Sequence, residues 1–262
     1  MISIKNVNKW YGNFQVLTEC ITEVKKGEVV VVCGPSGSGK STLIKCVNAL
    51  EPFQKGDIVV DGTSIADPKT NLPQLRSRVG MVFQHFELFP HLTITENLTI
   101  AQIKVLGRSK AEATEKGLKL LERVGLSAHA HKHPGQLSGG QQQRLALALA
   151  LVNDPQVVLL DEPGAALDPQ SRRAVWALIR EMQGEGRTVL LTTHSMEEAQ
   201  ELCDRVGIVD GGRLVALGAP GELIQRYAPP LPPAEAARRQ PNLEDVFLAL
   251  TGRGLAVTSE EL

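Results

Sequence analysis

The sequence is poor in cysteine, and it contains neither a long apolar run nor a long basic run. Its four cysteines are scattered through 262 residues without a C-x-x-C pair, which argues against a disulfide framework or a zinc site and favours core thiols. The longest apolar stretch, Leu145–Val152, is far shorter than the roughly 18 residues that a membrane-spanning helix needs. The net charge of −1, without a basic cluster, gives no indication of a nucleic-acid partner.

The N-terminus, Met1 to Lys5, also lacks the charged start, apolar middle and cleavage site of an export signal. We therefore expect the chain to stay in the cytoplasm, and any work at a membrane to go through a partner. A length of 262 residues allows one large domain or two modest ones.

A glycine-rich segment, G-P-S-G-S-G-K-S-T, directly follows the apolar run Val29–Cys33. Its spacing matches the G-x-x-x-x-G-K-[ST] phosphate loop, in which a strand leads through a tight turn into a helix N-terminus. Lys40 is placed to reach the β- and γ-phosphates, and the Ser41 hydroxyl is a ligand suited to Mg²⁺. The segment predicts a nucleoside triphosphate site made by Gly34, Pro35, Ser36, Gly37, Ser38, Gly39, Lys40, Ser41 and Thr42.

Two acidic residues, Asp161 and Glu162, follow a second apolar run, Val157–Leu160. Parallel strands place their ligand-binding residues at their C-terminal ends, so Asp161 is expected to hold Mg²⁺ from a second side. Glu162 beside it is expected to polarise the attacking water as a general base. Paired acids at a strand end also occur in solvated turns, but the phosphate loop upstream favours the catalytic interpretation.

Residues Leu137–Gln141 read L-S-G-G-Q and lie between these two motifs. Ser138 is expected to cap a helix whose glycine-rich first turn leaves N–H groups for an anion, although S-G-G alone is common in ordinary capped helices. The segment resembles the signature of ATP-binding-cassette (ABC) ATPases, and this resemblance covers about residues 1–225. It implies ATP and Mg²⁺ as cofactors, with nucleotide contacts from Ser138, Gly139, Gly140 and Gln141.

The same resemblance gives roles to four further residues. Tyr11 is similar to the aromatic residue that stacks on adenine, with a half-buried core tyrosine as the alternative. Gln84 is similar to the glutamine that senses Mg²⁺ and water, and His194 to the switch histidine that contacts the γ-phosphate. Without the resemblance, the alternatives are an exposed glutamine at a strand end and a structural histidine. Asp168 resembles the nucleotide-site loop that pairs two subunits, and could equally be a helix cap. The catalytic residues implied are Lys40, Gln84, Glu162 and His194.

The expected fold is α/β, a phosphate-loop (RecA-like) ATPase core with an antiparallel β subdomain and an inserted helical subdomain. Within the insert, Ser109 and Glu112 predict a capping box, Leu118, Leu121 and Val124 share one helix face, and Gly125 ends the helix. The last ten residues are expected to fray. The predicted parts are the β subdomain and phosphate loop (1–86), the helical subdomain with the signature (87–150), the second part of the core (151–227), and a proline-rich linker with a C-terminal helix (228–262).

The resemblance also implies partners. Two copies are expected to pair head to tail around ATP, and the dimer to bind integral membrane permease subunits and, through the complex, an extracytoplasmic solute-binding protein. The chain would then be peripheral on the inner face of the cell membrane.

The two parts of the chain resemble different branches of the family. Residues 1–135 resemble ATPases of polar amino-acid uptake, of the glutamine type, and residues 145–262 resemble multidrug or polysaccharide exporters, as in a chimera. Because Gln84 and the helical insert receive the membrane subunit in this family, the pattern favours polar amino-acid uptake. Export and a soluble non-transport ABC ATPase are the alternatives, and Gly164, where the family usually has a hydroxyl residue, also allows a binding module with little turnover.

Overall fold

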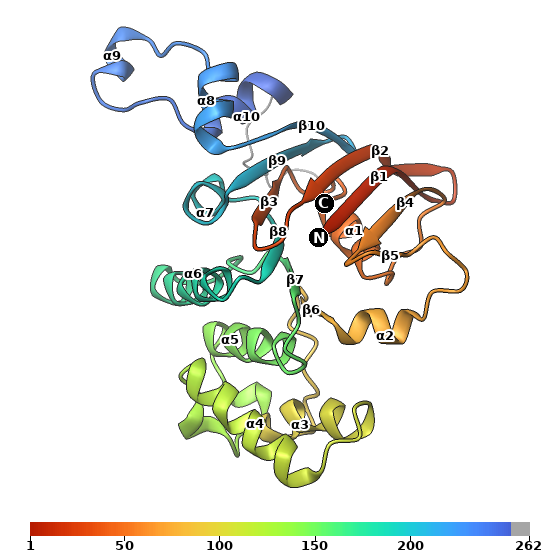
Figure 1. Ribbon diagram of the computed structural model, residues 1–262. Coiled ribbons are helices and arrows are strands. Elements are labelled where there is room, and N and C mark those ends of the chain that lie inside the picture. The colour runs from red at the N-terminus through yellow and green to blue at the C-terminus, as the bar shows by residue number, and fades with distance from the viewer. Residues whose placement is uncertain (253–262) are drawn as a thin grey trace. The chain divides into compact units, whose positions relative to one another are not determined.

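The computed structural model describes residues 1–252, and the chain divides into two compact units (Figure 1). The first unit combines residues 1–70 with the described residues from 190 onward, and the second contains residues 71–189. The predicted fraying of the last ten residues falls outside the described residues.

The first unit opens with an antiparallel sheet in the order β2-β1-β4-β5. Ile2 of the first strand pairs with Val24 on one side and Val60 on the other, and all three side chains are buried. Alternating apolar residues at the start of the chain therefore form the strand that they predict. The strands are β1 (Ile2–Tyr11), β2 (Phe14–Val24), β4 (Lys55–Val60) and β5 (Thr63–Ser64).

A second sheet of the first unit carries the phosphate loop. Its strand β3 (Val29–Cys33) is buried at every residue, as expected for an apolar run with both faces covered. It pairs in parallel with β9 (Arg205–Asp210), which forms a hairpin with β10 (Arg213–Gly218). On its other side lies β8 (Thr188–Thr193), which begins in the second unit and ends in the first.

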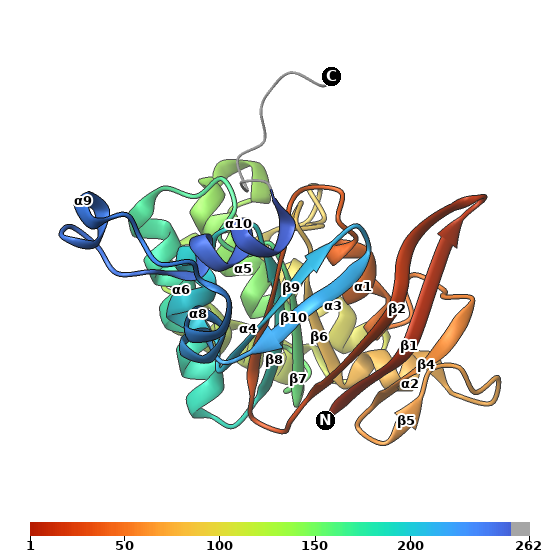
Figure 2. The same cartoon turned by 90° about the horizontal axis from the view of Figure 1, so that it is seen from above.

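The helices of the first unit are α1 (Lys40–Val47), α7 (Met196–Leu202), α8 (Pro220–Tyr227), α9 (Pro233–Ala236) and α10 (Leu243–Thr251). Asn242 caps α10, and Figure 2 shows α10 together with α8. Helix α10 packs against α8 and α7, and its Phe247 is completely buried. Arg239 donates two hydrogen bonds, of 2.6 and 2.9 Å, to Asp245, and this pairing lowers the pKa of the carboxyl group. The C-terminal helix that the sequence predicts within residues 228–262 is therefore present as α10.

The second unit is mainly helical, with one pair of parallel strands in which Val82 lies opposite Leu160. No helix in the described part of the chain is long and apolar enough to cross a membrane. The elements are α2 (Leu72–Ser77), β6 (Val79–Val82), α3 (Ile94–Lys104), α4 (Lys110–Arg123), the 3-10 turns η1 (Ser127–His129) and η2 (Pro134–Gln136), α5 (Gly139–Ala150), β7 (Val157–Asp161) and α6 (Pro169–Gly184).

Helix α4 confirms its predicted ends and corrects its predicted face. Ser109 and Glu112 form the capping box, and Gly125 follows the helix at a φ of 67°. Leu118, however, is 44% exposed. The buried stripe instead runs through Ala113, Gly117, Leu120, Leu121 and Val124, because α3 packs closely against Gly117, where an added Cβ would lie 3.4 Å from Leu98 Cβ.

Candidate functional site

The predicted site residues divide between the two units. The first unit contains Tyr11, the phosphate loop and His194, and the second contains Gln84, the signature segment, Asp161, Glu162 and Asp168. Each set has its own local geometry.

The phosphate loop is a tight turn whose glycines are required by the backbone. Gly37 and Gly39 have φ values of 75° and 97°, a region that residues with a Cβ rarely adopt. An added Cβ at Gly39 would also lie 2.9 Å from Leu17 Cδ2 and from the Val16 oxygen. At Gly34 it would overlap the Val209 oxygen of β9. Close packing around the loop therefore leaves room only for glycine at these two positions.

The N-terminus of α1 is suited to an anion. Among the described residues no side chain caps this helix, and its N-cap is Gly39. The Ser38 hydroxyl is buried without a hydrogen-bond partner in the described part of the chain. A buried hydroxyl normally has a partner, so an oxygen-rich ligand such as a phosphate would satisfy it. These features fit the triphosphate that the motif predicts.

Lys40, the first residue of α1, is folded back into the loop. Its side chain is only 4% exposed, and its ammonium group donates a 3.0 Å hydrogen bond to the Pro35 oxygen. The Ser38 N–H donates to the same carbonyl, at 3.2 Å. The positive charge is therefore held inside the turn, where a bound phosphate would meet it.

Tyr11 lies beside the phosphate loop. The ring is 46% exposed, and the hydroxyl group donates a hydrogen bond to Glu51 and accepts one from Thr42. Burial of the hydroxyl and the bond to Glu51 raise the pKa of Tyr11. The structure thus brings together two residues, Tyr11 and Thr42, that sequence analysis assigned separately to the base and the phosphates.

The chain makes a strained turn where β7 ends. Asp161 is the last strand residue and is almost fully buried, and Glu162 follows with a φ of 50°. A glutamate in this left-handed region is uncommon, and such strain concentrates at functional sites. Gln84 is exposed and lies two residues beyond Val82 of β6, the strand parallel to β7. Gln84 and the two acids therefore follow the same ends of neighbouring strands.

The signature segment forms a capped helix start. Ser138 accepts a hydrogen bond from the Gln141 N–H, and the Gln141 side chain accepts one from the Ser138 N–H at 2.9 Å. This capping box uses neither the Gly139 nor the Gly140 N–H, as predicted for an anion-binding end. At Gly140 an added Cβ would overlap the Ser171 side chain of α6, so this glycine also serves helix packing.

Two residues with open interpretations are placed as follows. Asp168 caps α6, accepting hydrogen bonds from the Gln170 and Ser171 N–H groups, and its contacts with Ser171 lower the pKa of the carboxyl group. His194 is exposed directly after β8, the strand beside β3. Asp168 therefore has the capping role that sequence analysis allowed.

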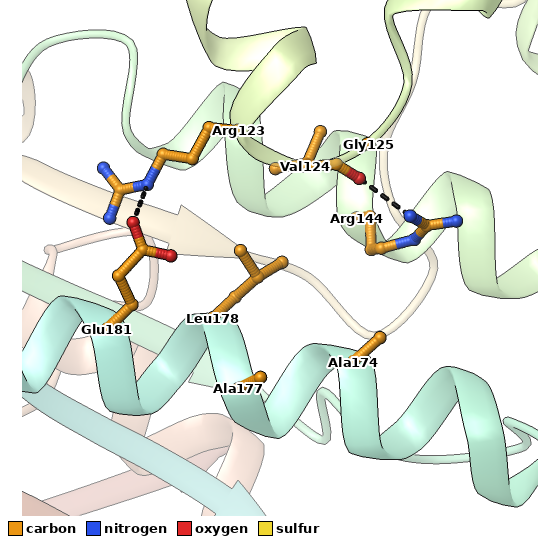
Figure 3. A pocket seen from close by; sticks show the side chains of 8 residues that line it. All are labelled: Arg123, Val124, Gly125, Arg144, Ala174, Ala177, Leu178 and Glu181. Atoms are coloured by element: carbon orange, nitrogen blue, oxygen red, sulfur yellow. Dashed lines mark hydrogen bonds and ion pairs between the residues drawn. The ribbon is translucent and has the colours of Figure 1, made fainter.

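A pocket of about 380 Å³ lies within the second unit, and none of its lining residues is a predicted site residue (Figure 3). Arg123 pairs with Glu181 at 2.9 Å, and Arg144 donates to the Val124 oxygen at 2.8 Å. The arginines flank a floor formed by α6. The lining residues are Arg123, Val124, Gly125, Arg144, Ala174, Ala177, Leu178 and Glu181.

The cysteines are placed as core residues. Cys20, Cys33 and Cys46 are buried. Burial raises the pKa of Cys46 and of the half-buried Cys203 to about 12, so neither thiol is poised for reaction at neutral pH.

Sequence analysis missed two residues beside Tyr11, namely Lys9 and Glu51. The Lys9 ammonium lies 4.3 Å from the centre of the Tyr11 ring and 3.4 Å from Glu51 Oε2. Lys9 is two positions before Tyr11 on the same strand, a spacing that places side chains on one face of a sheet. That spacing was an available signal, whereas nothing in the sequence pointed to Glu51.

Comparison with known proteins extends these observations. The model of the ABC transporter family matches residues 17–165. The glutamate/aspartate import ATP-binding protein GltL of Escherichia coli K12 is 65% identical over 82% of this chain and 89% of its own length. The glutamine transport ATP-binding protein GlnQ of Bacillus subtilis is 46% identical over 88% of this chain and 94% of its own.

Solved structures give the same result for the fold. The dimeric post-hydrolysis state of the ATP-binding cassette MJ0796, bound to ADP and Pi, superposes with a TM-score of 0.77 at 34% identity, covering 84% of this chain and 98% of that one. An ATP-binding subunit of an ABC transporter gives a TM-score of 0.80 at 26% identity, over 95% and 99% of the two chains. The predicted α/β phosphate-loop fold is confirmed, and the chain belongs to the ABC transporter family as one of its ATP-binding and ATP-hydrolysing cassettes.

Proposed function

We propose that this ATPase drives the uptake of polar amino acids, with glutamate and aspartate as the first candidates. The observation that carries the proposal is the 65% identity to GltL, a protein named for glutamate and aspartate import, over 89% of that protein's length. The other relatives support the wider class, because they include glutamine and general L-amino-acid transport ATP-binding proteins.

Mg²⁺ is the metal that suits the predicted residues. Ser41 offers a hydroxyl oxygen and Asp161 a buried carboxylate, and hard cations prefer oxygen ligands. When bound, Mg²⁺ would neutralise charge on the phosphates. The roles assigned to this chain's own residues are phosphate contact by Lys40, water polarisation by Glu162, sensing of metal and water by Gln84, and γ-phosphate contact by His194.

The chain is proposed to act as a head-to-tail dimer. A dimeric ATP-binding cassette is among its structural neighbours, at 34% identity, which supports pairing. In this arrangement Ser138 to Gln141 of one copy would close over the phosphate loop of the other, with Asp168 at the subunit interface. A second anion-binding helix end excludes water and adds donors where negative charge develops.

The dimer is proposed to lie on the cytoplasmic face of the membrane, bound to permease subunits and supplied by an extracytoplasmic solute-binding protein. The support is GltL of Escherichia coli among its relatives, a protein named as the ATP-binding protein of glutamate/aspartate import.

Complementation tests the cargo directly. The chain is expressed in an E. coli strain that lacks GltL, and uptake of radiolabelled glutamate and aspartate is measured, with Glu162→Gln as the inactive control. We expect uptake to return with the natural chain alone. Restoration only in a strain lacking GlnQ would make glutamine the cargo. Failure in both strains, with an expressed and ATP-hydrolysing protein, would overturn the uptake proposal and favour export.

A further inference from the structure

A buried lysine lies outside the residues assigned so far. Lys9 is 3% exposed, although lysine is almost never fully buried unless it is paired. Its ammonium group lies 3.4 Å from the carboxylate of Glu51 and 4.3 Å from the centre of the Tyr11 ring. The burial of this charge is therefore offset by an ion pair and a cation–π contact.

Glu51 joins this arrangement from a second direction. Its carboxylate accepts a hydrogen bond from the Tyr11 hydroxyl, which itself accepts one from Thr42 of the phosphate loop. The ring of Tyr11 is thus held at its face by Lys9 and at its hydroxyl by Glu51 and Thr42. Because three groups fix it, the ring keeps one orientation relative to the loop.

The orientation has a consequence for a bound base. An aromatic ring has two faces, and Lys9 occupies one of them. The ring is still 46% exposed, so surface remains for a stacking partner. A ring that is already fixed loses little conformational freedom when a base stacks on it, and binding is tighter for that reason.

We propose that Lys9 and Glu51 are positioning residues that hold Tyr11 in place to stack on the adenine of ATP. The inference rests on the proposed function of Tyr11 as the base-stacking residue. Lys9 and Glu51 act through the ring, and neither contacts the phosphates. A merely structural ion pair would instead stabilise the strand without changing nucleotide affinity.

A double-mutant cycle separates these two roles. The dissociation constant of ATP is measured for the natural chain, Lys9→Met, Tyr11→Ala and the double variant. We expect Lys9→Met to weaken ATP binding roughly three- to tenfold, the range of one cation–π contact. In the Tyr11→Ala background the same substitution should have no further effect. Inorganic tripolyphosphate, which has no base, should bind equally to all four proteins.

Two further variants guard against a simple loss of folding. Lys9→Arg keeps a cation over the ring and should restore the natural affinity. Glu51→Gln, at a side chain that is 30% exposed, should weaken ATP binding in the same direction, again only when Tyr11 is present.

The chain supplies a matched control. Lys55 lies over the neighbouring aromatic ring, with its ammonium 5.7 Å from the centre of Trp10. Lys55→Met removes the same kind of contact from the same sheet and should leave the affinity for ATP unchanged.

The outcomes distinguish this inference from the function on which it rests. If Tyr11→Ala binds ATP normally, the stacking role of Tyr11 is wrong. If Tyr11→Ala weakens binding but Lys9→Met does not, or does so equally in both backgrounds, the positioning role is wrong. Weaker tripolyphosphate binding by Lys9→Met would also overturn it, because Lys9 would then act on the phosphates.

Discussion

The phosphate loop and the segment after β7 both lead from a buried strand into a helix, but they are built differently. The phosphate loop has glycines at its left-handed positions, Gly37 and Gly39. The second segment has Glu162 and Ala166 there, with φ values of 50° and 56°. A left-handed conformation costs a residue with a Cβ roughly 1–2 kcal/mol, so only the second segment is strained.

The helices that follow differ in the same way. Helix α1 has no side-chain cap among the described residues, whereas Asp168 caps α6 with its own carboxylate. An uncapped helix start can receive a ligand's negative charge, and a capped one has already satisfied two of its N–H groups. The first loop is shaped to bind an anion, and the second holds side chains in fixed positions.

The largest expected effect is on ATP hydrolysis, and it tests whether the strained turn at Glu162 serves catalysis. Glu162→Gln should lower ATP hydrolysis roughly 10²-fold or more, because a positioned catalytic group is lost, while ATP binding is retained. The variant should also accumulate as a dimer with Mg-ATP. Phosphate release and size-exclusion chromatography measure the two effects. Normal turnover in this variant would remove Glu162 from the role of general base.

Paired glycine substitutions test the construction of the phosphate loop. Gly39→Ala meets both an unfavourable φ and a clash with Leu17 and Val16, and should lower the free energy of unfolding by more than about 2 kcal/mol. Gly37→Ala meets only the unfavourable φ, since nothing lies within 4 Å of the added Cβ, and should cost about 1 kcal/mol. Denaturant unfolding compares the two. Equal losses would show that packing against β2 does not restrict the loop.

A second pair of variants tests the strain in the segment after β7. Ala166 is exposed, so Ala166→Gly removes little packing and relieves the left-handed strain. We expect a slightly higher melting temperature. Ala165→Gly, one residue earlier and without a positive φ, should lower it through the greater freedom of the unfolded chain. A lower melting temperature in both variants would mean that the turn at Ala166 is not strained.

The smallest effect concerns the cap of α6. The pKa of Asp168 is lowered in the folded chain, so its contribution to stability is present above the ordinary carboxyl pKa of about 4. That contribution is lost as the pH falls through the lowered folded value. Asp168→Ala should therefore melt below the natural chain at pH 7, and the difference should shrink below about pH 4. A difference independent of pH would show that the charge of Asp168 does not stabilise the helix.

Features that depend on residues close together in the sequence could be predicted from it. The phosphate loop, the capping boxes at Ser109 and Ser138 and the buried strand before Asp161 depend on neighbours a few positions away. Which face of α4 is buried could not be predicted in the same way. Leu118 is apolar and helical, yet Gly117 is the residue that α3 approaches, and that choice depends on a separate helix.

The site shows the same limit. Residue types predict roles for Lys40, Asp161 and Glu162, but they do not predict the backbone conformation at these positions. Nothing about a glutamate signals a φ of 50°. The contact of Lys9 with Glu51 joins residues far apart in the sequence, and no local pattern records it.

The phosphate loop depends on a turn formed much later in the chain. The Gly212 N–H donates to the Ser38 oxygen at 3.2 Å, and the Gly212 oxygen accepts from the Thr18 N–H at 2.8 Å. During synthesis the ribosome makes the motif well before it makes that turn and the neighbouring β9. A nascent chain halted before residue 212 would contain the complete phosphate-loop motif but not the Gly212 turn that supports it. We therefore expect the nascent chain to become able to bind nucleotide only near the end of translation.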